Sequence, residues 1–135
     1  MTILITGGAG FIGSHLVEQL LAATDEPLVV LDNLNDFYDP ALKRQNMAGW
    51  IDHPRVTFVE GDFCDPATCE RLLLDYPLSA ICHLGAAPGV PASLKQPRAC
   101  LETNVLGTLN LLEAARRRPV GRFLFASSST VYGKG

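Results

Sequence analysis

Four glycines near the N-terminus have the spacing of a phosphate-binding turn. Residues 6–13 read TGGAGFIG, with glycines at positions 7, 8, 10 and 13. We expect Gly7 to form a tight turn, Gly10 to let the backbone approach a pyrophosphate, and Gly13 to let a helix pack closely on a strand. The amide groups at the start of that helix, and its positive dipole end, would then face the anion. The pattern therefore predicts a dinucleotide-binding turn.

An acidic residue stands where such a turn needs a partner. Asp32 follows Gly13 by 19 residues and comes directly after the apolar segment 28–31. A carboxylate at this spacing accepts hydrogen bonds from the adenosine ribose and repels the 2′-phosphate of NADP. A glycine cluster alone is a weak signal, but a strand before it, a helix after it and Asp32 together predict NAD binding. The alternative is a glycine-rich turn beside a solvated Asp32, without a ligand.

The elements that must position these residues alternate along the chain. Short apolar segments predict strands, and three-and-four spacing of apolar residues predicts helices between them. Asp65 before Pro66 is a typical helix start, and Pro119 should end the last helix after its basic turn. The expected strands cover residues 3–5, 28–31, 56–59, 80–84 and 122–126, and the expected helices begin at residue 11 and cover 40–50, 66–76 and 98–117.

This alternation predicts an α/β fold. Strands that are continuously apolar indicate a parallel sheet covered by helices on both faces. Right-handed crossovers then give a doubly wound, Rossmann-type sheet with five strands in the order 3-2-1-4-5. A length of 135 residues, without a linker or internal repeat, indicates one domain over residues 1–135.

Composition narrows the possible function classes. Hydrophobic residues make up 47% of the chain, which indicates a folded protein rather than a disordered one. Eleven basic residues against fourteen acidic ones give a net charge of −3, which argues against a nucleic-acid partner. Apolar runs fall short of the roughly 20 residues of a membrane helix, and a signal peptide is not evident. We therefore expect a cytoplasmic protein without a membrane partner.

The cysteines lack the spacing of a metal site. Cys64, Cys69, Cys82 and Cys100 contain no C-x-x-C pair. A zinc site built from Cys64, Cys69 and a histidine is the alternative. We favour free, mostly buried thiols in a reducing compartment and expect no bound metal.

Other conspicuous residues have structural explanations. We expect His15 to be a packed or half-exposed helix residue and His83 to be a histidine with satisfied hydrogen bonds. Trp50 is expected to pack rather than to bind a substrate. The basic run 116–118 falls in the last turn of a helix, where cations complement the dipole, so a solvated helix end is the interpretation we favour.

Five segments resemble one known family. They are TGGAGFIGSHL at 6–16, the pair Gly61-Asp62, HLGAA at 83–87, ETNVLGTLNLLEA at 102–114, and SSSTVYG at 127–133. Together they are similar to the extended short-chain dehydrogenase/reductases that act as NAD-dependent nucleotide-sugar epimerases and dehydratases. Within that family, LDNLNDFYDPALK at 31–43 most resembles UDP-glucuronate 4-epimerases and related UDP-sugar epimerases.

The resemblance implies a set of site residues. Asp62 matches the acid that contacts adenine, residues 83–87 match a segment that passes under the cofactor, and Asn104 matches a helix asparagine near the active site. Ser128 stands where the family keeps its catalytic Ser or Thr. The implied NAD-binding residues are Gly7, Gly10, Phe11, Ile12, Gly13, Asp32, Asn33, Asp62, Phe63, Leu84, Gly85, Ala86 and Asn104.

Two departures from the family pattern bear on the reaction and on the substrate. Dehydratases carry Asp-Glu where this chain has Ser129-Thr130, which counts against dehydration. Glucuronate epimerases place Arg and an aromatic residue where this chain has Pro91-Ala92, which weakens the case for a uronate. The resemblance thus implies a UDP-sugar 4-epimerase that works by reversible hydride transfer through a 4-keto sugar.

The acid–base pair that this chemistry needs is not found in the sequence. The family's Tyr-x-x-x-Lys should follow Ser128 by about 25 residues, and Tyr38, Tyr76 and Tyr132 have no Lys four positions later. We therefore expect an N-terminal portion of an epimerase that is inactive by itself and self-associates through an open sheet edge or an exposed helix face. The alternatives are a non-catalytic NAD-binding module and the cofactor domain of a sugar-nucleotide decarboxylase or reductase.

Overall fold

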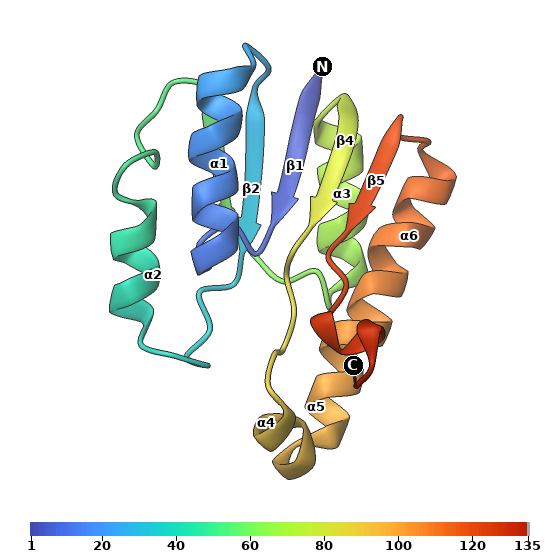
Figure 1. Cartoon of the computed structure of the whole chain (residues 1–135). Coiled ribbons are helices and arrows are strands. Elements are labelled where there is room, and N and C mark those ends of the chain that lie inside the picture. Colours follow the sequence, from blue (N-terminus) through green and yellow to red (C-terminus); the bar gives the residue numbers. More distant parts are fainter. Residues whose placement is uncertain (135) are drawn as a thin grey trace.

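A parallel five-stranded sheet forms the centre of the molecule (Figure 1). The structure is a computed structural model that describes residues 1–134. The strand order β3-β2-β1-β4-β5 and the parallel pairing of all neighbours confirm the predicted fold class and topology. The strands are β1 (Thr2–Thr6), β2 (Leu28–Asp32), β3 (Val56–Glu60), β4 (Leu78–His83) and β5 (Arg122–Phe125).

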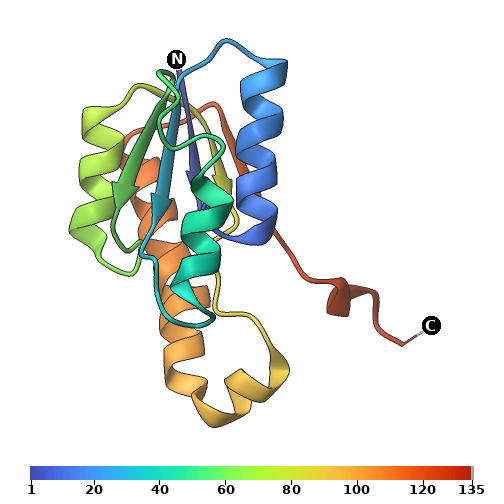
Figure 2. The same cartoon turned by 90° about the vertical axis from the view of Figure 1, so that its left-hand side faces the viewer.

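Helices cover both faces of this sheet. Figures 1 and 2 show α1 and α2 on one face and α3 and α6 on the other, while α4 and α5 extend beyond the carboxyl ends of the strands. The α-helices are α1 (Phe11–Ala23), α2 (Pro40–Met47), α3 (Pro66–Asp75), α4 (Val90–Lys95), α5 (Pro97–Leu101) and α6 (Thr108–Arg117). A π-helix, η1 (Glu102–Gly107), joins α5 to α6, and a 3₁₀ turn, η2 (Ser129–Tyr132), follows β5.

The sheet separates two hydrophobic clusters. The β1 and β2 strands are buried along their whole length, as their continuous apolar sequences predict. Val17, Met47 and Trp50 pack on one face of the sheet. Leu72 and Leu111 pack on the other. These two clusters fix the helices that surround the glycine turn and the residues after β4.

Side chains satisfy the ends of several helices. Asp65 accepts hydrogen bonds from the amides of Ala67 and Thr68, which confirms the predicted start of α3. Arg55, which precedes β3, donates to the carbonyl oxygens of Leu21 and Thr24 at the end of α1. The strand order is thus supported by polar contacts at the helix ends as well as by apolar packing.

The structure corrects two details of the sequence prediction. The expected helix over residues 98–117 is not one regular α-helix, because η1 interrupts it between α5 and α6. The short helix α4 was not predicted, since its start at Val90-Pro91 follows a glycine-rich loop rather than a periodic apolar pattern.

Conspicuous residues take the structural positions expected for them. Trp50 is buried in the core, and His15 is exposed and hydrogen-bonded to the carbonyl of Phe11. Arg116 and Arg117 form ion pairs at the exposed end of α6. All four cysteines are free thiols, but only Cys69 is fully buried, whereas Cys64, Cys82 and Cys100 are half-buried, so the expectation of mostly buried thiols is met only in part. Burial raises the pKa of Cys69 to about 12. In residues 1–134 we find no helix long and apolar enough to span a membrane.

Candidate functional site

The predicted site residues gather at one edge of the sheet. The chain leaves each parallel strand at its carboxyl end, so the segments that follow the strands meet there. The glycine turn follows β1, Asp32 ends β2, Asp62 follows β3, residues 84–86 follow β4, and Ser128 follows β5. The crossover that leaves β1 leads to β2 on one side of the sheet, and the crossover that leaves its neighbour β4 leads to β5 on the other side. Ligands of open α/β sheets bind at such a switch point.

Close backbone packing explains two glycines of the turn. Gly7 has φ +71°, and a Cβ added there would lie 2.8 Å from the Cα of Gly85. A Cβ on Gly13 would collide with the carbonyl oxygen of Gly7, so only glycine lets α1 lie this close to the turn. The turn is closed by a hydrogen bond from the Gly10 amide to the Gly7 carbonyl, 3.1 Å long.

The start of α1 is open to a ligand. Gly10 occupies the N-cap position, and no side chain caps the helix there. Phe11 and Ile12 are 73% and 70% exposed, so these apolar residues of the first turn do not lie on the buried face of α1. Uncapped amides beside a glycine turn fit a pyrophosphate group, which would accept hydrogen bonds from them.

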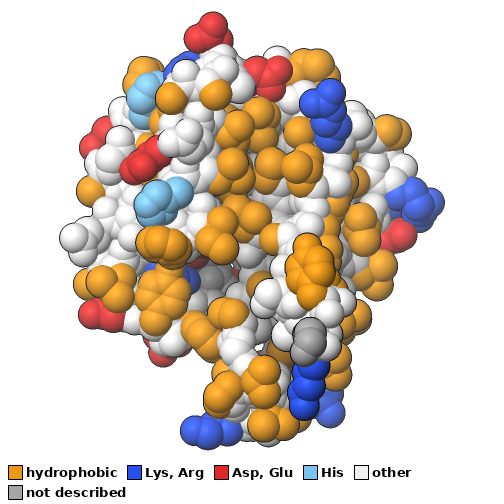
Figure 3. Space-filling view, viewed as in Figure 1, with side chains coloured by type: hydrophobic (Ala, Val, Ile, Leu, Met, Phe, Trp, Pro, Cys, Tyr) orange, Lys and Arg blue, Asp and Glu red, His pale blue; other side chains and the backbone are white. Residues whose placement is uncertain are grey.

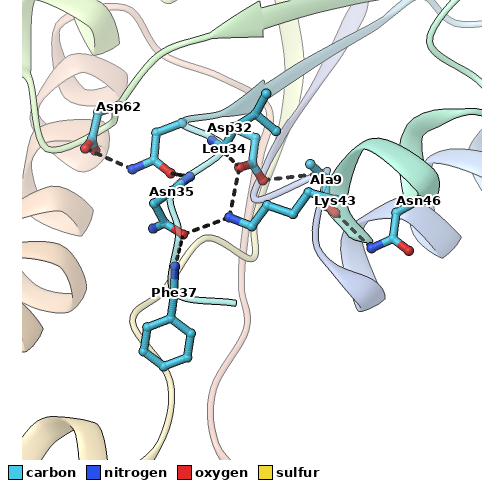
Figure 4. Close-up of polar contacts among 9 residues, drawn as sticks. Ala9, Asp32, Leu34, Asn35, Phe37, Lys43, Asn46 and Asp62 are labelled. Atoms are coloured by element: carbon cyan, nitrogen blue, oxygen red, sulfur yellow. Dashed lines mark hydrogen bonds and ion pairs between the residues drawn. The ribbon is translucent and has the colours of Figure 1, made fainter. Parts of the chain in front are cut away.

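The Asp32 carboxylate is held by the backbone on both sides (Figure 4). Its Oδ2 accepts a hydrogen bond from the Ala9 amide at 3.1 Å, and its Oδ1 accepts one from the Leu34 amide at 2.9 Å. Asp32 is 7% exposed, and its Oδ1 lies 3.5 Å from the ammonium nitrogen of Lys43. The fixed carboxylate retains further lone pairs for ribose hydroxyls.

Asn33 and Asp62 are brought together across the loops after β2 and β3. The Asn33 amide nitrogen donates to Asp62 Oδ2 at 3.1 Å. The other carboxylate oxygen of Asp62 accepts from the Cys64 amide at 2.8 Å. This pair borders the site on the β3 side, where the resemblance implies contact with adenine.

The side chain of Phe63 lies in the core rather than on the open face of the site. It is 8% exposed and contacts the His83 ring edge-on, with the ring centroids 5.0 Å apart. A Cβ on Gly85 would collide with this ring. The Phe63 ring therefore packs against the core side of the segment Leu84–Ala86. A contact between Phe63 and the cofactor would involve the Phe63 backbone.

Hydrogen bonds engage both ring nitrogens of the buried His83. Thr6 Oγ1 accepts a hydrogen bond from the Gly85 amide and lies 2.6 Å from Nδ1 of His83, to which its hydroxyl donates when the ring carries its hydrogen on Nε2. On the other side, Thr108 donates its hydroxyl to the Asn104 carbonyl and accepts from Nε2 of His83 at 2.9 Å. Burial lowers the pKa of His83 to about 4. The prediction of a satisfied structural histidine is confirmed.

Asn104 holds the segment after β4 in place. It lies in η1, and its amide group exchanges two hydrogen bonds with the Ala87 backbone: Oδ1 accepts from the amide at 2.8 Å and Nδ2 donates to the carbonyl at 3.0 Å. π-Helical turns are frequent at functional sites because they redirect side chains. Here the turn brings Asn104 to Ala87, so Asn104 positions residues 84–87.

Ser128 lies exposed beyond the end of β5. Its Oγ accepts hydrogen bonds from the Thr130 hydroxyl at 2.9 Å and from the Thr130 amide at 3.3 Å. Two accepted bonds leave the Ser128 proton available for another acceptor. Figure 2 shows that the chain from this point extends away from the helices, toward the C-terminus.

Three residues at the site were missed by sequence reasoning. Lys43 and Asn46 from α2 reach back to the site: Lys43 pairs with Asp32, and Asn46 donates to the Ala9 carbonyl at 3.0 Å (Figure 4). The Tyr38 side chain lies beside Lys43. A signal was available for one of them, because Lys43 stands four residues before the buried Met47 and so falls on the inner face of α2.

Comparison with known proteins agrees with this geometry. Residues 3–135 match the sequence model of the NAD dependent epimerase/dehydratase family. The chain belongs to this family. Its cofactor is therefore NAD, and the glycine turn with its uncapped helix start and fixed carboxylate fits that group.

Individual relatives include epimerases and a dehydratase. UDP-glucose 4-epimerase of Erwinia amylovora is 40% identical over 98% of this chain and 38% of its own length. UDP-glucuronic acid 4-epimerase from Bacillus cereus, solved with UDP-glucuronic acid and NAD, has a TM-score of 0.90 at 34% identity. That match covers 100% of this chain and 42% of the solved one. A dTDP-glucose 4,6-dehydratase from Streptomyces venezuelae, with NAD bound, has a TM-score of 0.89 at 39% identity, with the same coverage. The chain thus spans about two fifths of the length of these relatives.

Proposed function

We propose that this chain is the NAD-binding part of a nucleotide-sugar 4-epimerase. Bound NAD supplies a hydride acceptor and donor for one carbon of the sugar. The chain's own residues would bind and orient it: the glycine turn and Asp32 would hold the cofactor, and residues 84–86 would contact it. The other residues proposed to contact it are Phe11, Ile12, Asn33, Asp62, Phe63 and Asn104.

One observation carries this proposal. Ser128 presents a hydroxyl with a free proton at the same sheet edge as the glycine turn, at the end of the neighbouring pair β4 and β5. A hydroxyl so placed can hold the sugar oxygen while the carbon is oxidised to a 4-keto sugar and reduced on its other face. Ser129-Thr130, in place of the Asp-Glu of dehydratases, favours epimerisation over dehydration.

A second candidate is a non-catalytic NAD-binding module. It is favoured by the exposed position of Ser128, whose hydroxyl hydrogen-bonds only to the nearby Thr130 among the described residues. The NAD site would then serve binding without sugar chemistry, and Ser128 would be a loop residue.

Two measurements test the proposal. Purified protein, including any downstream coding sequence in the gene, is incubated with a panel of UDP-sugars, and C4 epimers are detected by NMR. We expect interconversion of one 4-epimer pair, lost in Ser128→Ala with NAD binding retained. NAD binding without turnover of any sugar supports the second candidate.

The cofactor site is tested separately by titration. We expect NAD to bind more tightly than NADP, and Asp32→Ala to weaken NAD binding by about tenfold or more, because charge-assisted hydrogen bonds to the ribose are lost. Equal affinities for both cofactors, or an unchanged NAD affinity in Asp32→Ala, would contradict the role given to Asp32.

A further inference from the structure

Lys43 is a buried cation at the edge of the proposed cofactor site. It is 5% exposed, although lysine is almost never fully buried without a partner. Its ammonium donates to Asn35 Oδ1 at 2.8 Å, lies 3.5 Å from Asp32 Oδ1, and stands 5.2 Å from the centre of the Tyr38 ring. Figure 4 shows the Asp32 and Asn35 contacts. Because removing such a group from water is costly, the Asp32 charge is what keeps Lys43 in place.

An unsatisfied hydroxyl group lies beside this ion pair. Tyr38 Oη is buried and has no hydrogen-bond partner among the described residues. A Cβ built on Gly10 would lie 3.9 Å from it, so the hydroxyl faces the glycine turn. Burial and the negative charge of Asp32 raise the pKa of Tyr38, which keeps it a hydrogen-bond donor. A phosphate oxygen bound at the glycine turn would give this donor a hydrogen-bond partner.

We propose that Lys43 is a cofactor-selectivity residue whose ammonium is a phosphate-binding group neutralised by Asp32. The proposal rests on the cofactor site described above. Asp32 would then exclude NADP in two ways. Its charge repels a 2′-phosphate, and it pairs with the ammonium of Lys43, the one cation that contacts Asp32 in the described part of the chain, which is then not available to the phosphate. Without the Asp32 charge, Lys43 would be left unpaired and buried, and a 2′-phosphate would relieve that cost.

This mechanism differs from simple repulsion in one respect. If repulsion alone excluded NADP, removal of the Asp32 charge would improve NADP binding whether or not Lys43 is present. If Lys43 binds the phosphate, the improvement depends on Lys43. The two substitutions are therefore expected to be coupled, which a double-mutant cycle measures directly.

The experiment titrates purified protein with NAD, NADP, 5′-AMP and 2′-AMP by calorimetry. In Asp32→Ser we expect the Kd for NADP and for 2′-AMP to fall by about tenfold or more. Asp32→Ser/Lys43→Met should lose most of that gain, and Lys43→Arg on the Asp32→Ser background should keep it. Arg44→Met is the matched control, because Arg44 is an exposed cation on the same helix and its loss should leave the gain intact.

The outcomes separate this inference from the proposed function. Failure of the unmodified protein to bind NAD would overturn the cofactor site itself. Normal NAD binding, with an equal NADP gain in Asp32→Ser and Asp32→Ser/Lys43→Met, would overturn the role of Lys43 alone. Melting curves identify any variant that fails to fold, and Asp32→Asn, which keeps the shape of the side chain and its acceptor for the Leu34 amide, then replaces Asp32→Ser in the same cycle.

Discussion

At the scale of single residues, both ring nitrogens of His83 are hydrogen-bonded to threonine hydroxyl groups. The hydroxyl groups of Thr6 and Thr108 each use their proton in one direction, so Nδ1 accepts and Nε2 donates. A second proton on the ring, at Nδ1, would displace the Thr6 hydroxyl hydrogen, which would then need another acceptor, while the Thr6 oxygen accepted from both Nδ1 and the Gly85 amide. The low pKa of His83, about 4, follows from burial in this arrangement.

This arrangement predicts a pH-dependent stability. Unfolded His83 takes up a proton near pH 6.5 and the folded residue only near pH 4. The unfolded state therefore binds more protons between these two pH values. The stabilising contribution of neutral His83 is lost as the pH falls through this window. We expect the free energy of unfolding to drop by about 2 kcal/mol between pH 7.5 and pH 5 from this group.

Urea unfolding at pH 7.5, 6.0 and 5.0 measures this effect. His83→Gln, which lacks the titrating group, should show a weaker dependence on pH over the same range. His15→Gln is the matched control, because His15 is exposed on α1 and its replacement should leave the dependence as it is. Equal pH dependences in the unmodified protein and His83→Gln would refute the assignment.

At the scale of elements, η1 links a helix to the segment after β4. Asn104 pairs with the Ala87 backbone through both ends of its amide. In Asn104→Ala the amide of Ala87 loses its acceptor, which costs about 1–3 kcal/mol where the group is buried. We expect exchange of the Ala87 amide hydrogen to quicken by about tenfold or more and NAD binding to weaken with it.

Asn110→Ala provides the comparison for this prediction. Asn110 also donates its side-chain amide to backbone carbonyls, those of Phe63 and Cys64, but it does not contact Ala87. Its removal should lower stability while the Ala87 amide stays protected. If both variants left Ala87 exchange unchanged, Asn104 would have no positioning role.

The elements also show where sequence reasoning succeeds and why it fails elsewhere. The apolar segments of β1 and β2 predict buried parallel strands, and Asp65-Pro66 predicts a helix start, because these signals are local. The π-turn of η1 has no such local signal. It accompanies contacts with Ala87 and Phe63, residues distant in the sequence, that only the folded chain brings together.

The candidate site follows the same division. Gly7, Gly13 and Asp32 could be assigned from spacing, since the fold repeats the same turn and acid wherever it binds a dinucleotide. The role of Lys43 could not, because an inward-facing lysine on a short helix is explained only by its distance to Asp32. Phe63 shows the converse: the sequence places it at the site, and packing turns its side chain into the core.

At the scale of the whole molecule, two apolar surfaces are exposed. Figure 3 shows hydrophobic side chains over the sheet between α1 and β5, and over the region of α4 and α5. Leu124 on β5 is 54% exposed and lies beside Cys82 on β4. A second set follows the helical segment from α5 to α6 at spacings of four, four and three residues: Leu101, Val105, Leu109 and Leu112.

These surfaces support the expectation that the chain self-associates. Contiguous exposed apolar side chains are typical of interfaces, and an open strand edge can pair with another chain. Sedimentation equilibrium should show association that increases with concentration, and Leu109→Glu should shift it toward monomer. Leu74→Glu, which changes an exposed leucine on α3, should not. A monomer at every concentration would rule this expectation out.

The fixed Asp32 carboxylate has a consequence for how the cofactor binds. Two backbone amides and one ammonium already define its rotamer, and the Asn46 side chain ties α2 to the glycine turn. These groups of the protein therefore lose little conformational entropy when the adenosine part of the cofactor binds. The backbone of this region should move by less than about 1 Å on binding, so that association is governed by diffusion and orientation rather than by a slow rearrangement of the protein.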